Sequence, residues 1–455
     1  MIESALAEIG RRGEEIAAAV FLGGTEKVLE NNNLSISGYP VVTAADPLAA
    51  IKAAIEKYRP EAVVDLSDEP IVGYLERFEI ACLVLAEGLI YRGADFELRP
   101  PTFEDLSTKP SMAIIGTGKR VGKTAVSAYA CRELKARGFN PAVVAMGRGG
   151  PAEPEVIRGD QIKIDADYLL AQAKQGRHAA SDHFEDALMS RVPTVGCRRC
   201  GGGLAGEPFI SNVRAGALVA NGLETDFTVF EGSGAAMPPV AVNTRVTVAG
   251  ANQPVDYIIG YLGPYRLLIS DLVVLTNCED HIEPGKLKAI TEGIARIKPG
   301  INVVKTIFRP LPLDDISGKK VFFATTAPES TGSILAEYLE SAFGAEVAGI
   351  SHNLSNRPRL RQDLAKSGDF DILLTELKAA AVDVATAVGT ELNKQIVYCD
   401  NVPVVREGGS LADHLVGLAK ESVVRFKGSG RRPIGPVKIG RSGPKPRMQG
   451  RRTPR

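Results

Sequence analysis

The segment GTGKRVGKT at residues 116–124 constrains the fold of this 455-residue chain more than any other. It follows the apolar run Met112–Ile115 and opens a helix-forming stretch that runs to Gly138. Glycines between a strand and a helix let backbone N–H groups turn inward, and the helix N-terminus adds a positive field, so such a loop cradles a polyphosphate. We predict nucleotide contacts from Gly116, Thr117, Gly118, Val121, Gly122, Lys123, Thr124 and Ala125.

The side chains of this loop have distinct predicted roles. Lys123 supplies a point charge for the β- and γ-phosphates, and the Thr124 hydroxyl suits a Mg²⁺ ligand. Lys119 and Arg120 add two cations that we count as catalytic candidates. The loop begins Gly-Thr, which is similar to the dethiobiotin-synthetase-like branch of P-loop proteins. The partitioning ATPases carry a signature lysine five residues before Lys123, where this chain has glycine.

Strand-like and helix-like segments alternate along most of the chain, which predicts an α/β fold. We expect a three-layer P-loop core with a mostly parallel sheet and a smaller N-terminal α/β domain. The predicted units are an N-terminal domain (1–108), a nucleotide-binding domain (109–315), a C-terminal α/β extension of the core (316–426) and a basic disordered tail (427–455). The tail is rich in Gly, Pro and Arg, and it is either a solubilising extension or a weak contact for RNA or polyphosphate.

Two further motifs predict a metal site. The apolar strand in VFEGSG (229–234) delivers Glu231 to the carboxyl edge of the sheet, where ligands of open α/β sheets bind. Asp165 and Asp167 open a helix in DADYLLAQ, a position that carries a metal-binding Asp in the dethiobiotin synthetases. Asp167 aligns best, and Asp165 could equally cap the helix. We predict that Thr124, Asp167 and Glu231 hold Mg²⁺.

Cationic and glycine-rich loops are concentrated in the same block, which predicts a multiply anionic second substrate because Arg binds phosphate bidentately. The candidates for this substrate are Arg148, Arg198, Arg199, Gly201, Gly202, His183 and Arg245. Arg148 follows the strand next to the phosphate loop and is also a catalytic candidate. Asn277, in TNCED, resembles a weak base-recognition loop and is assigned to the nucleotide.

Composition excludes several classes of protein. No apolar run reaches the ~20 residues of a membrane span, and the N-terminus has no apolar core of a signal peptide. Six scattered cysteines fit reduced thiols in a cytoplasmic protein. Residues 427–455 contain ten Lys/Arg and no Asp/Glu, so the rest of the chain is acidic overall and no specific nucleic-acid binder.

Taken together, these motifs resemble the cyclic 2,3-diphosphoglycerate synthetase family. The matches are AVFLGGTEK (19–27), IIGTGKRVGKTAVSAY (114–129), AMGRGGP (145–151), GCRRCGGGLAG (196–206), FEGSGAAMPP (230–239) and FFATTAPE (322–329). The resemblance implies that ATP, with Mg²⁺, phosphorylates 2,3-bisphosphoglycerate, and that the neighbouring phosphate then closes a cyclic phosphoanhydride. We also expect a homodimer. The alternatives are a 2-phosphoglycerate kinase, a dethiobiotin-type ligase and a nucleotide-gated switch protein.

Overall fold

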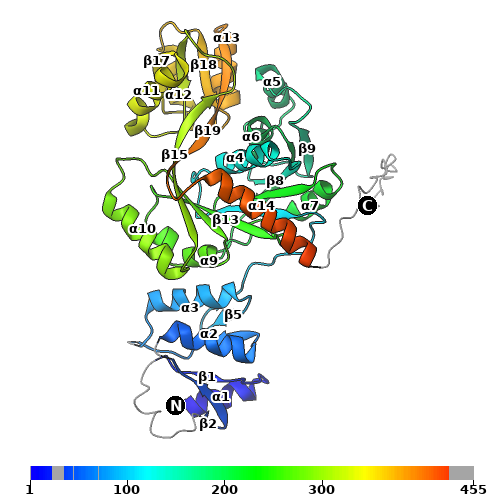
Figure 1. Cartoon of the computed structure of the whole chain (residues 1–455), viewed down its shortest axis with the longest axis vertical. Helices are drawn as coiled ribbons and strands as arrows, with labels where there is room; N and C mark the ends of the chain where they lie inside the picture. The colour runs from blue at the N-terminus through cyan, green and yellow to red at the C-terminus, as the bar shows by residue number, and fades with distance from the viewer. Residues whose placement is uncertain (1, 23–34, 45, 70, 430–455) are drawn as a thin grey trace, which may run out of the picture.

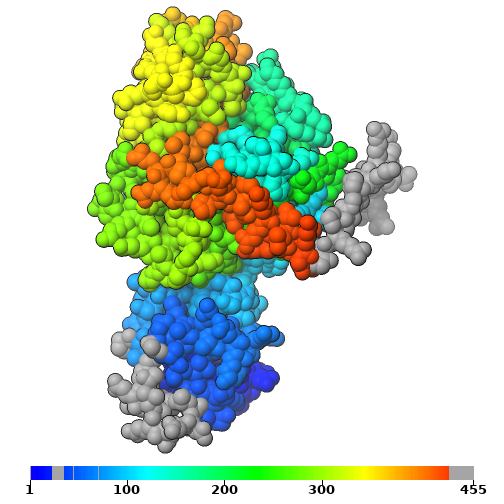
Figure 2. All heavy atoms as spheres, in the orientation of Figure 1, coloured from blue at the N-terminus to red at the C-terminus, as the bar shows by residue number. Residues whose placement is uncertain are grey.

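The computed structural model describes residues 2–429 except 23–34, 45 and 70. Figure 1 shows an N-terminal domain at one end, a central sheet with helices on both faces, and a second α/β unit at the other end. The space-filling view shows a narrower waist between the N-terminal domain and the rest (Figure 2). The predicted α/β class is therefore confirmed by the arrangement of layers. No helix in the described part of the chain is long and apolar enough to cross a membrane.

Most of the molecule is organised by one sheet of thirteen strands, in the order β11-β10-β8-β12-β7-β13-β14-β15-β19-β18-β16-β17, with β9 paired to β10. Its first half is parallel from β10 to β15, and β7, β8, β12 and β14 are buried along their whole length. The strands of this half are β7 (Ser111–Gly116), β8 (Pro141–Gly147), β9 (Glu155–Arg158), β10 (Pro193–Cys200), β11 (Ile210–Ser211), β12 (Phe227–Glu231), β13 (Thr244–Gly250), β14 (Leu272–Thr276) and β15 (Asn302–Pro312).

Helices cover both faces of the parallel half. On one face lie α4 (Lys123–Ala136), α6 (Asp182–Ser190) and α14 (Leu411–Gly428), with α5 (Ala166–Lys174) beside them. The remaining helices of this half are α7 (Val213–Asn221), α8 (Asp256–Ile259), α9 (Gly263–Leu268) and α10 (Pro284–Ile297). The C-terminal helix α14 packs against α4 and β7, so this part of the predicted C-terminal extension lies on the nucleotide-binding half.

The sheet reverses direction at one long ribbon. Strand β15 is antiparallel to β19 (Gln395–Glu407), and β19 is parallel to β18 (Ile372–Glu376), β16 (Lys320–Ala324) and β17 (Glu346–Ser351). The helical segments of this second half are η2 (Glu329–Thr331), α11 (Gly332–Phe343), α12 (Arg357–Ala365), the π-helix η3 (Ala381–Thr386) and α13 (Ala387–Glu391). Because of the reversal, the carboxyl ends of both parallel halves point toward the same space.

The N-terminal domain has two small sheets. Strand β1 (Ala19–Val20) pairs with β3 (Tyr39–Val42), which also pairs with β2 (Ser35–Ile36). The second sheet contains β4 (Ala62–Val64), β5 (Ile90–Arg92) and β6 (Glu97–Leu98). Its helices are α1 (Ile2–Arg11), α2 (Pro47–Tyr58) and α3 (Tyr74–Ala86). The carboxylate of Asp46 caps helix α2 by accepting a 2.9 Å hydrogen bond from the backbone of Ala49.

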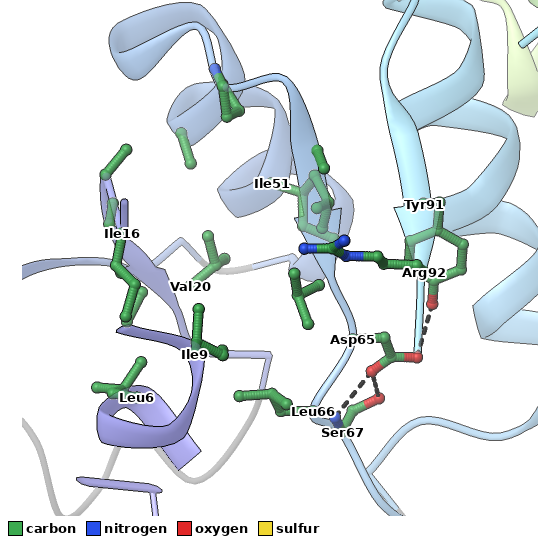
Figure 3. A pocket seen from close by; sticks show the side chains of 18 of the residues that line it. Leu6, Ile9, Ile16, Val20, Ile51, Asp65, Leu66, Ser67, Tyr91 and Arg92 are labelled. Atoms are coloured by element: carbon green, nitrogen blue, oxygen red, sulfur yellow. Dashed lines mark hydrogen bonds between the residues drawn. The ribbon is translucent and has the colours of Figure 1, made fainter. Parts of the chain in front are cut away.

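An apolar cleft of about 1080 Å³ lies within the N-terminal domain, between β1 and β4. Figure 3 shows side chains of α1, β1 and α2, among them Leu6, Val20 and Ile51, pointing into it from several sides. At one end Asp65 accepts hydrogen bonds from Ser67 and from the Tyr91 hydroxyl, the latter at 2.7 Å.

The tail predicted to be disordered, residues 427–455, lies outside the described residues except for 427–429. Helix α14 extends into its beginning and ends at Gly428.

Candidate active site

The phosphate loop has the local structure that its sequence predicts. It connects β7 to α4, and the helix begins at Lys123. Gly122 has φ +89°, a conformation that only glycine adopts without strain. A Cβ on Gly116 would lie 2.8 Å from Cδ of Lys123, so the lysine side chain folds back over this glycine. These two positions explain why the loop needs glycine.

Lys123 points into its own loop. Its Nζ donates a 2.9 Å hydrogen bond to the backbone oxygen of Gly118. Burial lowers the pKa of Lys123 to about 8, although the carboxylates of Glu231 and Asp182 favour its charged form. A buried ammonium held by a single carbonyl is suited to exchange that contact for a phosphate oxygen.

Thr124 and Glu231 meet at the end of β12. The Thr124 hydroxyl donates a 2.7 Å hydrogen bond to Oε1 of Glu231, whose side chain is buried. Burial raises the pKa of this carboxyl, and hydrogen bonds with Asp186 and Thr124 oppose that shift. The buried carboxyl of Asp186, on α6, lies within hydrogen-bond reach of Glu231, and neither Oε2 of Glu231 nor the Asp186 oxygens have a donor partner among the described residues. Two buried carboxyls in contact favour a shared proton or a cation between them.

A cavity of about 840 Å³ opens above these groups. The carboxyl ends of strands from both halves of the sheet line it, as the reversal at β15 and β19 requires. From the phosphate loop and α4 the lining residues are Lys119, Arg120, Gly122, Lys123, Thr124 and Ala125, and from neighbouring strand ends they include Arg148, Glu231 and Asn277. The structure thus brings together nine of the residues that the sequence predicted for the site.

Asp182 is a cavity residue that sequence reasoning missed. It is the first residue of α6, lines the cavity and lies close to β8, since its Oδ2 is 3.0 Å from where a Cβ on Gly147 would be. Burial raises its pKa, and Lys123 opposes that rise. The available signal was an aspartate at a helix start, which is the same signal that favoured Asp167.

Asp167, the aspartate predicted to bind the metal, lies outside the cavity. It is exposed in the first turn of α5 and does not line the cavity. Asp165 is the cap of that helix, because its Oδ1 accepts a 3.0 Å hydrogen bond from the backbone of Tyr168. The predicted metal role of Asp167 is therefore not supported by its placement, whereas Asp182, also in the first turn of a helix, does line the cavity.

Two other candidates are displaced from the cavity. His183 is buried between α6 and β10, where a Cβ on Gly196 would be 2.6 Å from its ring, and burial lowers its pKa to about 4. Arg245 is the second residue of β13, whereas the opposite end of that strand faces the cavity. Its guanidinium lies 4.8 Å from the centroid of the Phe103 ring and donates to the backbone oxygen of Ile269. Both are packing residues.

The arginines of β10 differ from one another. Arg198 is exposed, and its Nε donates a 2.7 Å hydrogen bond to the backbone oxygen of Gly150. Arg199 is buried and turns toward the phosphate loop, where a Cβ on Gly234 would lie 3.1 Å from Arg199 and 3.5 Å from Lys119. Gly201 and Gly202 follow on the same exposed loop, and Gly201 accepts a 2.9 Å hydrogen bond from Arg199.

The cations at this edge repel one another. Burial, and then the charges of Arg148 and Arg199, lower the pKa of Lys119. Arg148 is exposed and forms no ion pair with any residue that the structure describes. The carboxylate of Asp182 offsets part of this repulsion, because its charge favours the protonated forms of Lys119, Lys123 and Arg199. The concentration of cations at this edge favours an anionic ligand.

The second half of the sheet forms the opposite wall of the cavity, to which the sequence analysis gave no role. Glu376 accepts 2.7 Å hydrogen bonds from the hydroxyls of Thr325 and Thr326, in the FATTAPE loop after β16. Lys378 crosses to the first half and forms a 3.1 Å ion pair with Glu185 of α6. His352, Asn353 and Asn401 complete this wall. Only the long-range reversal of the sheet brings these residues to the phosphate loop.

A phosphate loop at the carboxyl edge of a parallel sheet, with a carboxylate at the end of a neighbouring strand, defines a P-loop nucleotide-binding enzyme. Three family models match the chain: the N-terminal domain (residues 1–99), the P-loop domain (111–307) and the C-terminal domain (312–402) of cyclic 2,3-diphosphoglycerate synthetase. The chain belongs to this family. The predicted family and the predicted ATP-binding P-loop class are thereby confirmed.

Named relatives cover almost the whole chain. The cyclic 2,3-diphosphoglycerate synthetase of Rubrobacter xylanophilus is 54% identical over 398 residues, which are 87% of this chain and 89% of that protein. The enzyme of the same name from Methanothermus fervidus is 51% identical over 424 residues, covering 91% and 92% of the two chains. Among solved structures, LpxK from Aquifex aeolicus in complex with ATP is 12% identical, with a TM-score of 0.40, over 70% of this chain and 90% of that one.

Proposed function

We propose that this protein converts 2,3-bisphosphoglycerate to cyclic 2,3-diphosphoglycerate, using ATP and releasing ADP and inorganic phosphate. The observation that carries the proposal is the group of like charges around the phosphate loop: Lys119, Lys123, Arg148 and Arg199 gather where two anionic substrates would meet. Family membership supplies the identity of the acceptor.

The reaction balances in two steps. A phosphate oxygen of the acceptor attacks the γ-phosphorus of ATP, and the bond to the β-phosphate oxygen breaks to release ADP. An oxygen of the neighbouring phosphate then attacks the phosphorus atom of the acceptor that carries the transferred group, and the bond to that group breaks to release inorganic phosphate. Both steps depend on charge stabilisation and on holding the attacking oxygen roughly 3–3.5 Å from phosphorus. We assign Lys123, Lys119, Arg120 and Arg148 to charge stabilisation on the moving phosphoryl group.

The residues around Glu231 fit Mg²⁺. Thr124, Glu231 and Asp182 offer hard oxygen atoms, and the contact between the buried carboxyls of Glu231 and Asp186 is one that a cation would stabilise. No group of three or more His, Cys, Asp or Glu among the described residues forms a complete cage, which fits an ion that takes its other ligands from phosphates and water. When bound, Mg²⁺ would neutralise charge on the phosphates of ATP.

The adenine and acceptor contacts are further proposals. Asn277 lines the cavity beside Phe308, whose ring would be 2.2 Å from a Cβ on Gly122, so we assign this side of the phosphate loop to the base. The opposite side, toward Arg148, Arg199 and the glycines after β10, is assigned to the acceptor. Arg198 reaches this side only through the backbone of Gly150.

One assay distinguishes this activity from the alternative activities. Phosphorus NMR of a reaction with ATP, Mg²⁺ and 2,3-bisphosphoglycerate should show phosphoanhydride resonances, with ADP, phosphate and cyclic product in a 1:1:1 ratio. Monophosphorylated glycerates should give no cyclic species. Conversion of 2-phosphoglycerate to the bisphosphate without free phosphate would replace the proposal with a kinase.

Two expectations remain predictions, a homodimer and a cytoplasmic location. Four apolar side chains between β4 and the start of α3 support the first: Leu66, Ile71, Tyr74 and Leu75 are exposed by 54%, 55%, 76% and 66%. All six cysteines are free, which fits a reducing compartment. Light scattering would test the dimer, and fractionation of the native cells would test the location.

A further inference from the structure

The turn that follows Glu231, residues 232–237, is held by two arginines from different elements. Nη2 of Arg199, on β10, donates a 2.8 Å hydrogen bond to the backbone oxygen of Ser233. Nη2 of Arg266, on α9, donates a 2.8 Å hydrogen bond to the backbone oxygen of Ala235. Ser233 and Gly234 line the cavity beside the phosphate loop. The two guanidiniums therefore hold one loop of the active site from both sides.

Both guanidiniums are buried, and the hydrogen-bond acceptors of both among the described residues are backbone oxygens. The exposed fractions of Arg199 and Arg266 are 6% and 4%, and neither forms an ion pair with a described residue. The Nε atom of each is buried and has no hydrogen-bond partner among the described residues. Asp182 is near enough to favour the charged form of Arg199, but no carboxylate in the described part of the chain hydrogen-bonds to either guanidinium, so an anion bound at the turn would supply a close counter-charge.

Two glycines, Gly206 beside the turn and Gly232 at its start, lie in close contact with its backbone. A Cβ on Gly206 would be 3.0 Å from Nη2 of Arg266 and 2.9 Å from the backbone oxygen of Ala235. A Cβ on Gly232 would be 2.8 Å from the backbone oxygen of Ala236. Side chains at these two positions would displace the turn. The glycines therefore keep the turn close to the arginines.

Arg266 also connects the turn to the N-terminal domain. Its helix α9 packs on α3, and just before α9 the backbone oxygen of Tyr261 accepts a 3.2 Å hydrogen bond from Sγ of Cys82. The rings of Phe78 and Tyr261 meet edge to face, with centroids 5.5 Å apart. Met237, in the turn itself, belongs to the same apolar cluster as residues of α3. The N-terminal domain thus supports the turn from behind.

We propose that the 232–237 turn binds a phosphate group of the acceptor. We further propose that Arg266 is a positioning residue that holds this turn against the N-terminal domain. The inference rests on the proposed function for the identity of the acceptor. It gives the N-terminal domain a role in acceptor binding rather than in ATP binding. In this arrangement Arg199 supplies the cation nearer to the bound phosphate, and Arg266 fixes the geometry of the turn.

The experiment compares Arg266→Gln and Arg266→Lys with the unmodified full chain. Calorimetry measures the dissociation constants of 2,3-bisphosphoglycerate and of ATP separately, and thermal unfolding confirms the fold. We expect Arg266→Gln to weaken acceptor binding about tenfold or more while ATP binding changes by less than about twofold. Arg266→Lys keeps the charge but loses the forked set of N–H donors, so its affinity for the acceptor should lie between that of Arg266→Gln and that of the unmodified protein. Arg425→Gln, which removes an exposed ion pair with Asp271, is the control.

A second variant tests the same inference if Arg266→Gln does not fold. Phe78→Leu loosens the contact between α3 and Tyr261 and should weaken acceptor binding alone, in the same direction. Equal losses of ATP and acceptor binding would show a general structural role and overturn the inference. Unmodified protein that binds the acceptor, with both Arg266 variants matching it, would overturn the inference and leave the proposed function standing. Unmodified protein that does not bind the acceptor would overturn the proposed function itself.

Discussion

The hydroxyl of Thr124 donates a 2.7 Å hydrogen bond to Oε1 of Glu231, joining the start of α4 to the end of β12. This bond connects two motifs that are more than a hundred residues apart in the sequence, and it places both oxygen atoms next to Lys123. The buried carboxyl of Asp186 also contacts Glu231, so a proton or a cation at this point would offset the repulsion between the two carboxylates.

Replacing Lys123 tests the phosphate loop. Lys123→Ala should reduce ATP turnover by ~10²–10³-fold, because a charge-assisted clamp on the transferring phosphoryl group is lost. The fold should survive, since among the described residues the Gly118 carbonyl is the one hydrogen-bond partner of the buried ammonium. Lys135→Ala, in the last turn of the same helix, is the matched control. Near-normal turnover in Lys123→Ala would remove the loop from the mechanism.

Arg148 is expected to act on the transferred group rather than on ATP affinity. Arg148→Ala should lower kcat by about 10²-fold, with ATP binding changed by less than about twofold. Steady-state kinetics and equilibrium ATP binding distinguish these effects. Arg214→Ala, which removes an exposed ion pair with Glu104, serves as the control. A change in ATP affinity alone would move Arg148 to the nucleotide site.

Variants of Asp182 and Asp167 should differ in their dependence on magnesium. Asp182→Asn should raise the Mg²⁺ concentration for half-maximal activity by roughly tenfold or more, because a hard oxygen ligand beside Glu231 is lost. Asp167→Asn should leave it unchanged, since Asp167 is exposed on α5. A magnesium titration of both variants is the measurement. The reverse pattern would restore the role that the sequence assigned to Asp167.

Asp65 predicts a pH-dependent stability of the N-terminal domain. Burial alone would raise the pKa of Asp65, but hydrogen bonds from Ser67, Tyr91 and Arg77 outweigh it and hold the pKa below its ordinary value of 3.8. A lowered pKa means that the unfolded chain takes up the proton first as the pH falls. The stabilisation is therefore complete well above pH 3.8 and is lost as the pH falls through the lowered pKa.

Asp65→Asn should accordingly reduce the free energy of unfolding by about 1.5–3 kcal/mol at pH 7, the range for hydrogen bonds to a charged group. The difference from the unmodified protein should shrink toward the acid end of a denaturant series followed by circular dichroism. Tyr91→Phe removes only the 2.7 Å hydrogen bond and should cost about 1 kcal/mol. Asp95→Asn, at an exposed position, is the control. A difference that stays constant with pH would contradict the assignment.

The sequence by itself determined the phosphate loop, the carboxylate at the end of β12 and the family. The phosphate loop and the carboxylate each follow directly on a buried strand, so local chain geometry is enough to place them. The family follows from runs of contiguous residues. Cations at strand ends were also partly predictable, because the carboxyl ends of parallel strands meet at one edge. Arg148 and Asn277 lie where that rule puts them.

Only the tertiary structure decided which of several similar residues belong to the site. Asp167 and Asp182 both begin helices, and Arg245 and Arg199 both lie on strands, but contact with the phosphate loop depends on how distant helices pack and which strand end faces the cavity. The wall formed by Glu376 and Lys378 depends on the reversal of the sheet at β15 and β19, and Arg266 reaches its turn only because α9 packs between the sheet and α3. These are long-range contacts set by packing of the whole core, and no local pattern in the sequence records them.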